Sequence, residues 1–247
     1  MNPSDEAKQP RGTARSAGDT PAHTPADGGL ERWSDVLDPS TRACWPIVAA
    51  ASPPAGVLMG GTALAIHLRH RRSRDLDIFV HEPFDADELL SEMQAAAEVV
   101  LVGLDEGTLN CLANGVKVQF LEARGQRSIE PPMRLAGLAV GSVRDIAATK
   151  YKVIGDRGEL RDYFDLMRLA DAGIDPKMGI RLYCKRYGVG LEHPSVAHIV
   201  RALGSFHDIA DDPWLAEAAP DASIAAISDY WKQRQPELAA WLAFTLQ

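Results

Sequence analysis

Cysteine is scarce in this 247-residue sequence, and long apolar runs are missing from it. The three cysteines, Cys44, Cys111 and Cys184, lie far apart and form no CxxC pair. This spacing argues against a zinc site and against a disulfide framework, so we expect a reducing, cytoplasmic compartment. No apolar run approaches the roughly 20 residues that span a bilayer, and the polar, proline-rich N-terminus does not resemble a signal peptide. We therefore expect no membrane partner.

Basic charge is also in deficit, since 26 Lys and Arg face 34 Asp and Glu, for a formal net charge of −8. A protein this acidic does not bind polynucleotides through its whole surface, so a nucleic-acid substrate would need a local basic patch. The candidate is the run HLRHRRSR at residues 67–74, which contains four arginines. A solvated loop is the alternative interpretation of that run.

Several common catalytic and cofactor motifs are missing. The sequence has no Walker A motif, no GxGxxG, no GxSxG and no HxxxH, which removes the signatures of P-loop, dinucleotide-binding and serine-hydrolase sites. Three tryptophans of the C-terminal region, Trp214, Trp231 and Trp241, are more typical of helix packing than of a base-stacking platform.

The fold class we predict is α+β, in three parts. Residues 1–29 lack apolar periodicity and are expected to form a disordered tail. Residues 30–130 predict a small mixed sheet with flanking helices, and residues 131–247 read as a helical C-terminal domain. Strands are expected at 56–59, 75–80, 98–103, 108–113 and 116–121, and the last two are joined by an Asn114-Gly115 hairpin turn. Helices are expected at 39–51, 62–68, 85–97, 143–155, 160–171, 176–187, 195–204 and 222–243.

Two aspartates, Asp75 and Asp77, begin one of these strands. Side chains two apart on a strand point to the same side, so both carboxylates should project together while Leu76 packs into the core. Paired carboxylates repel one another, and a divalent cation removes that conflict. Magnesium typically takes one or two carboxylates together with substrate phosphates. A lone DxD can also be a turn former at a strand end.

A Gly60-Gly61-Thr62 turn precedes this strand and supplies the other half of the predicted site. Glycines let the backbone approach a ligand closely, and a helix opening at Thr62 would direct free N–H groups at a phosphate. We also place Arg71 and Ser73, from the connecting run, among the candidate nucleotide-binding residues. The reaction this pattern favours is attack by an acceptor hydroxyl on the α-phosphate of an NTP, with loss of pyrophosphate.

The segment from Gly60 to Phe79 resembles the signature of the AbiEii/AbiGii toxin nucleotidyltransferases, which belong to the DNA polymerase β-like superfamily. A second segment, from Ser142 to Lys150 and from Arg157 to Leu166, is similar to later motifs of that family. The resemblance implies a polymerase β-like core, Mg²⁺, an NTP substrate and a toxin of a type IV toxin–antitoxin or abortive-infection system. It also implies an adjacently encoded antitoxin and, as in some relatives, tRNA or another RNA as the acceptor.

Residue by residue, the resemblance implies roles for two groups of side chains. Gly60, Gly61 and Thr62 would cradle phosphates, and Asp75 and Asp77 would hold magnesium. Lys150 would contact the triphosphate, while Asp162 or Asp165 would position or activate the acceptor. From the residues alone, Lys150 could equally be a solvated helix lysine, and Asp162 and Asp165 could serve helix capping and surface pairing.

One departure concerns the third carboxylate that polymerase β-like enzymes commonly place on a later strand. Gln119 occupies the position predicted to face the site, and Glu122 is out of phase with it. Either a single metal dominates, or a carboxylate such as Asp165 substitutes. Two alternatives to the toxin therefore stay open: a small-molecule, antibiotic-type adenylyltransferase and a catalytically degenerate nucleotide-binding module.

Overall fold

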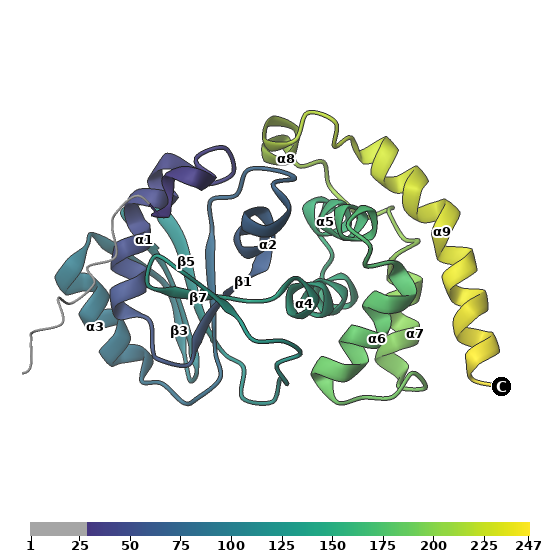
Figure 1. The fold of residues 1–247 in the computed structure, drawn as a ribbon, viewed down its shortest axis with the longest axis horizontal. Helices are drawn as coiled ribbons and strands as arrows, with labels where there is room; N and C mark the ends of the chain where they lie inside the picture. The colour runs from purple at the N-terminus through teal and green to yellow at the C-terminus, as the bar shows by residue number, and fades with distance from the viewer. Residues whose placement is uncertain (1–28) are drawn as a thin grey trace, which may run out of the picture.

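Seven strands form one mixed sheet in the N-terminal half of the molecule, and a cluster of helices forms the other half (Figure 1). The structure is a computed structural model that describes residues 29–247. The tail predicted for residues 1–29 lies outside the described residues except for Gly29. The α+β class is confirmed, with flanking helices on the sheet and a helical region after it.

The sheet has the strand order β3-β4-β5-β2-β1-β7-β6. Antiparallel pairing joins β1 to β2, whereas β2 pairs with β5 and β1 pairs with β7 in parallel. The strands are β1 (Gly56–Met59), β2 (Leu76–Val80), β3 (Val99–Asp105), β4 (Thr108–Ala113), β5 (Val116–Glu122), β6 (Met133–Leu135) and β7 (Leu138–Val140).

Helices lie on both faces of this sheet (Figure 1). α1 and α3 pack on one face, against β3, β4 and β5, and α2 contacts β1 and β2. α4 packs against α2 and is surrounded by α5, α6 and α7, with α9 outermost. The helices are α1 (Pro39–Ala51), α2 (Gly60–Leu68), α3 (Ala86–Ala96), α4 (Val143–Asp156), α5 (Leu160–Asp171), α6 (Pro176–Tyr187), α7 (Pro194–Ala202), α8 (Pro213–Ala218) and α9 (Ile224–Thr245), preceded by a 3₁₀ turn (Glu31–Trp33).

Local signals account for most of these elements. The side chain of Asp38 accepts a hydrogen bond from Ser40 N–H at the start of α1, and this capping satisfies a free donor of the helix N-terminus. Asn114 and Gly115 both have positive φ, 48° and 78°, as a two-residue hairpin turn requires. The predicted start of α1 and the β4–β5 hairpin are confirmed.

Three element predictions need correction. The chain does not continue as helices alone after residue 131, because β6 and β7 extend the sheet to Val140. The six-residue helix α8 was not predicted, and α2 begins at Gly60 rather than at Thr62. The division into a core at 30–130 and a helical domain at 131–247 stays a proposal, with the sheet itself reaching past residue 131.

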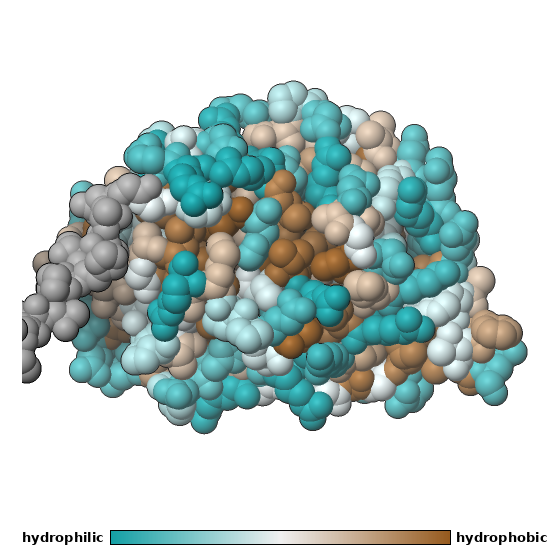
Figure 2. Space-filling view, viewed as in Figure 1, coloured by the Kyte–Doolittle hydropathy of each residue, from teal (hydrophilic) through white to brown (hydrophobic). Residues whose placement is uncertain are grey.

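Polar side chains cover most of the face in Figure 2, and apolar side chains gather near its middle, between the sheet half and the helical half. Within residues 29–247, none of the helices combines the length and the apolar character needed to cross a membrane.

Candidate active site

A cleft of about 900 Å³, part of it open to solvent, lies between the sheet and α4. Its floor is one side of β2 and β5, where alternate side chains face the cleft and the intervening ones enter the core. Leu76 is fully buried, as predicted, while Asp75 and Asp77 line the cleft. The other lining residues are Gly60, Gly61, Thr62, Arg71, Ser73, Arg74, Phe79, Lys117, Gln119, Leu121, Ile146, Thr149, Lys150, Val153, Arg157, Arg161, Asp162 and Trp214.

The register of β2 and β5 arranges the floor in rows. Asp77 lies opposite Gln119, and Phe79 lies opposite Leu121. The floor therefore runs from charged side chains at the start of β2 to apolar ones further along. Gln119 faces the site as predicted, in the place where a third carboxylate would be expected.

The Gly60-Gly61 pair brings the start of α2 against the acids. A Cβ atom on Gly60 would overlap the Asp77 carboxylate, and one on Gly61 would overlap the Arg71 guanidinium. Gly60 also has a φ of 68°, which L side chains rarely adopt. Met59, at the N-cap position of α2, makes no side-chain capping bond, and the first three residues of the helix line the cleft. The first N–H groups of α2 are therefore left without a side-chain cap.

Neither Asp75 nor Asp77 forms an ion pair within residues 29–247, although both lie among charged residues. Burial, and then the neighbouring Asp75 carboxylate, raise the pKa of Asp77 above its ordinary value. A divalent cation would reverse both effects, and two carboxylates plus substrate phosphates are a donor set that magnesium accepts. No group of three or more His, Cys, Asp or Glu side chains in the described part of the chain is arranged to hold a metal. The residues present therefore fit a metal that completes its shell with substrate oxygens.

Thr62 and Ser73 support the site rather than presenting free hydroxyls to it. The Thr62 hydroxyl shares a 2.7 Å hydrogen bond with Ser73 Oγ and donates to the backbone carbonyl of Asp75. Both residues are buried, with 1% and 5% exposure. These bonds fix α2 to the residue just before β2, so any phosphate contact at Thr62 has to come from its backbone N–H.

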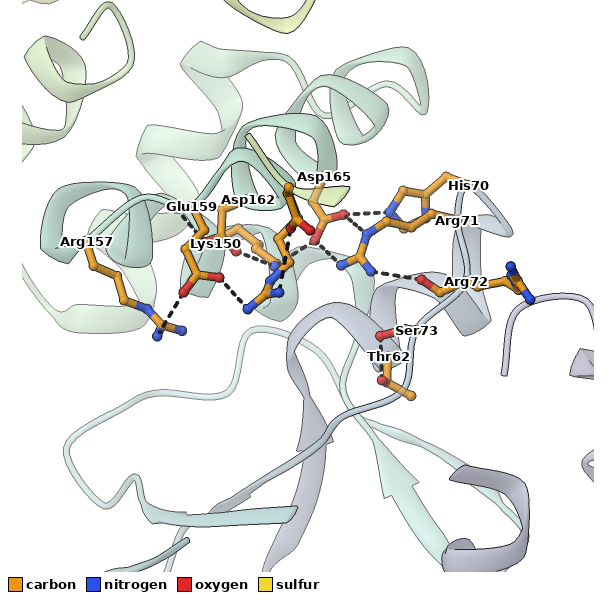
Figure 3. A network of polar contacts seen from close by, with 12 residues as sticks. Thr62, His70, Arg71, Arg72, Ser73, Lys150, Arg157, Glu159, Asp162 and Asp165 are labelled. Atoms are coloured by element: carbon orange, nitrogen blue, oxygen red, sulfur yellow. Dashed lines mark hydrogen bonds and ion pairs between the residues drawn. The ribbon is translucent and has the colours of Figure 1, made fainter. Parts of the chain in front are cut away.

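A buried ionic cluster joins the loop after α2 to α4 and α5 (Figure 3). Lys150 Nζ lies 2.7 Å from Asp162 Oδ1 and 2.6 Å from Asp165 Oδ2. Burial alone would lower the pKa of Lys150, but the two carboxylates outweigh it and hold that pKa above its ordinary value. Lys150 and Asp162 line the cleft, so a charged ammonium stands beside the space for phosphates.

Asp165 sits deeper in this cluster and does not line the cleft. Its carboxylate accepts two hydrogen bonds from Arg71, at 2.7 and 2.9 Å, and one from His70 Nε2 at 2.8 Å. Burial would raise the pKa of Asp165, but Arg71 and Lys150 outweigh burial and hold it well below its usual range. A carboxylate engaged by three basic side chains is poorly suited to ligate a metal or to accept a proton from an acceptor.

The arginine-rich run is neither one basic patch nor one solvated loop. Arg69 pairs with Asp35 at the surface, and Arg71 is buried on Asp165. Arg72 reaches Glu217, while Arg74 stacks over the Trp214 ring at 4.3 Å and lines the cleft. The run therefore contributes two arginines, Arg71 and Arg74, to the cleft.

The structure adds cleft residues that the sequence did not indicate. Lys117 faces the cleft two residues before Gln119, and strand alternation alone should have placed it there. Trp214 belongs to α8, far along the chain, and no local signal marks it as a cleft residue. Arg157 and Arg161 lie in the second segment that resembles the family, where no role was assigned to them. Trp214 is half-buried in the cleft wall instead of being a core packing residue, whereas Trp231 is fully buried as predicted.

These features define an α+β protein whose cleft suits an anionic, metal-bound ligand. The profile of the AbiEii toxin, a nucleotidyl transferase of type IV toxin–antitoxin systems, matches residues 47–117. A protein of Aquifex aeolicus (strain VF5) described as uncharacterized is 31% identical over 159 residues, covering 63% of this chain and 75% of that protein. The chain belongs to the AbiEii family of nucleotidyltransferase toxins of type IV toxin–antitoxin systems. Membership implies an NTP substrate and an antitoxin partner.

Solved structures with a similar arrangement include MenT4, a nucleotidyltransferase toxin of Mycobacterium tuberculosis H37Rv. It has 18% identity and a TM-score of 0.47, and the match covers 83% of this chain and 86% of that one. A Helicobacter pylori protein described as a candidate nucleotidyltransferase has 16% identity and a TM-score of 0.47, with coverage of 82% and 94%.

Proposed function

We propose that the chain transfers a nucleoside monophosphate from an NTP to a hydroxyl of an RNA acceptor, such as tRNA, in a magnesium-dependent reaction that arrests growth. The observation that carries this proposal is the contact of the Asp77 carboxylate with the glycine start of α2. Anionic phosphates at that helix start would lie directly beside the acid pair.

In the proposed reaction, the acceptor oxygen forms a bond to the α-phosphorus while the bond from that phosphorus to the bridging oxygen breaks. Pyrophosphate leaves, and the hydroxyl proton passes to solvent or to a nearby base. Asp75 and Asp77 would hold magnesium, which when bound neutralises phosphate charge. The N–H groups of Gly60 and Gly61 would orient the triphosphate, and Lys150 would offset its charge.

The geometry suggests different roles for the two later acids. Asp162 lines the cleft, and its two carboxylate oxygens accept hydrogen bonds from Lys150 Nζ and from the backbone N–H of Glu159. We propose that it positions Lys150 and stands closest to an incoming acceptor. For Asp165 we propose a positioning role, since it holds Arg71 and Lys150 from behind the cleft.

Asp77→Asn tests the function. The variant should lose magnesium-dependent release of pyrophosphate and transfer of labelled NMP by at least about 100-fold, the scale expected for an essential electrostatic group, and it should no longer arrest growth. Asp87→Asn, on the exposed side of α3, is the matched control and should behave as the wild type. Full transfer activity in Asp77→Asn would refute the assignment of the acid pair.

Gln119 keeps a second candidate open, because it stands opposite Asp77 where a third carboxylate would complete a two-metal site. The candidate is a nucleotide-binding module without catalysis. Magnesium-dependent NTP binding with no pyrophosphate release by the wild type would favour it. The acceptor class is tested by offering labelled NTPs with total RNA or with aminoglycosides; labelling of the aminoglycosides alone would indicate a small-molecule transferase.

A further inference from the structure

A second hollow opens on the β5 side of the acid pair. Arg74, Asp75, Lys117 and Arg161 line both this hollow and the catalytic cleft, so the two meet at Asp75. The outer hollow continues over the β4–β5 hairpin, where Gly115 lies in its wall. A chain-like ligand could therefore run from the protein surface to the acids without leaving the groove.

Three of the eight residues that line this hollow are cationic. Arg74 and Lys117 are exposed, and neither forms an ion pair with a carboxylate in residues 29–247. Arg161 is the third cation, and Asp75 is the one acid among the groove's lining residues. In a chain with a formal net charge of −8, such a local concentration of positive charge favours an anionic ligand at this place.

Both arginines are held from a distant part of the chain. The Arg74 guanidinium lies 4.3 Å from the centre of the Trp214 ring, and Arg161 Nη1 lies 3.7 Å from Asp212, while Arg161 also pairs with Glu159 two residues earlier. Trp214 belongs to α8, and Asp212 is its N-cap. Guanidinium groups fixed in this way lose less freedom when they bind phosphate, because their orientation is already set.

The order of the strands places this groove opposite the phosphate cradle. The start of α2 follows β1 on one side of β2, and Lys117 lies on β5 on the other side, with Asp75 and Asp77 between them. In phosphoryl and nucleotidyl transfer, the attacking oxygen and the leaving group lie roughly in line on opposite sides of the phosphorus. With the triphosphate at Gly60-Gly61, the attacking hydroxyl would approach from the β5 side.

We propose that this cationic groove, defined by Arg74, Lys117 and Arg161, binds the phosphodiester backbone of the acceptor strand next to its reacting hydroxyl. The proposal rests on the proposed transfer reaction and makes it more specific. The groove meets the catalytic cleft at Asp75 and lies across the acid pair from Gly60 and Gly61. An acceptor without phosphodiester groups would gain little from it.

Lys117→Ala and Arg74→Ala test the groove with a labelled NTP and a single-stranded RNA oligonucleotide as acceptor. Each variant should raise KM for the RNA about 5- to 10-fold, since each removes a phosphate contact, and should reduce the slope of log KM against log salt by about 1. KM for the NTP should stay within about twofold, because the triphosphate is placed at Gly60 and Gly61, on the other side of the acid pair. Lys117→Arg should retain RNA affinity, and Lys185→Ala, an exposed lysine on α6, should match the wild type.

Direct binding separates failure of the groove from failure of the reaction. Fluorescence anisotropy of a 5′-labelled RNA oligonucleotide is measured without NTP, so it does not depend on catalysis. Weaker binding by Lys117→Ala, with no transfer by the wild type, would support the groove and contradict the reaction. Unchanged RNA binding in both variants, no RNA binding by the wild type, or a raised KM for the NTP alone would overturn the groove.

Discussion

Asp165 is a buried acid on which two buried cations depend. Its side chain is fully buried, and the charged groups that face it are Arg71 and Lys150, with His70 as a further hydrogen-bond donor. Burying a charge is costly unless other groups compensate it. Asp165 compensates two cations at once, and both of these also line the cleft.

Asp165→Asn should therefore destabilise the folded protein strongly. Removing one partner of a buried ion pair leaves uncompensated charge and costs about 3–5 kcal/mol, so the free energy of unfolding in urea at pH 7 should fall by that order. Asp171→Asn, an exposed position on the same helix, should change it by less than about 0.5 kcal/mol. A stability loss in Asp165→Asn no larger than in the control would show that the cluster is not a stabilising network.

Helix α4 carries Lys150, and its position depends on close packing against α6. A Cβ atom on Gly179 of α6 would overlap the ring of Tyr151, which is fully buried on α4. The absence of a side chain at Gly179 thus sets how closely the two helices approach. This contact lies on the side of α4 away from the cleft, so it positions Lys150 without touching substrate.

Gly179→Ala should push α4 and α6 apart. Overpacking of a filled core typically costs about 1–3 kcal/mol, which should outweigh the gain in helix propensity of about 1 kcal/mol. Thermal unfolding followed by circular dichroism measures the change. Gly173→Ala is a poor control because Gly173 has a φ of 93°; Lys177→Ala, exposed on the same helix, is the better one. An unchanged or raised Tm in Gly179→Ala would contradict the packing argument.

The elements that the sequence predicted are those with strong local signals. α6 begins at Pro176 behind the Asp175 cap, and the β4–β5 hairpin turns at Asn114-Gly115, so both could be located before the structure. β6 and β7 are three residues each and exist because β7 pairs with β1, some 80 residues earlier in the chain. α8 is also too short for periodicity to reveal. Non-local pairing and tertiary contact decide such elements, and neither is visible locally.

The same distinction applies to the site. The phase of β2 predicted that Asp75 and Asp77 share one face, and the phase of β5 predicted that Gln119 faces them. The burial of Asp165 under Arg71 depends on α5 docking against the loop after α2, which no spacing within either segment encodes. Trp214 reaches Arg74 from 140 positions further along the chain, for the same reason.

At the scale of the whole molecule, the ionic cluster joins the sheet half to the helical half; the ribbons of these halves are drawn in Figure 1. His70 and Arg71 follow α2 in the sheet half, while Lys150 and Asp165 belong to α4 and α5 of the helical half. Arg71 and Lys150 of this cluster also line the cleft, so the charges that join the halves also shape the site. Loss of the ion pairs of Asp165 should therefore both destabilise the fold and displace Arg71 and Lys150 in the cleft, and a low pH should cause that loss.

A fall in pH should lower the free energy of unfolding in two stages, because His70 and Asp165 titrate in different ranges. Burial lowers the pKa of His70 in the folded protein. Below pH about 6.5 the unfolded chain therefore binds a proton at His70 that the folded protein does not, and the free energy of unfolding falls. The pKa of Asp165 is held well below its usual range by Arg71 and Lys150, against the opposing effect of burial. The stabilisation from Asp165 is thus fully present above pH about 4, and it is lost as pH falls through the lower pKa of the folded state.

Urea unfolding of the wild type and of Asp165→Asn between pH 6 and pH 3 measures the Asp165 contribution. The gap in free energy between the two proteins should narrow as pH falls below about 4, because the variant lacks the carboxyl that titrates there. Asp171→Asn should keep a constant, small gap from the wild type over the whole range. A gap between wild type and Asp165→Asn that does not narrow between pH 4 and pH 3 would mean that the Asp165 carboxyl has the same pKa in the folded and unfolded states. The ion pairs of Asp165 with Arg71 and Lys150 would then contribute nothing to stability.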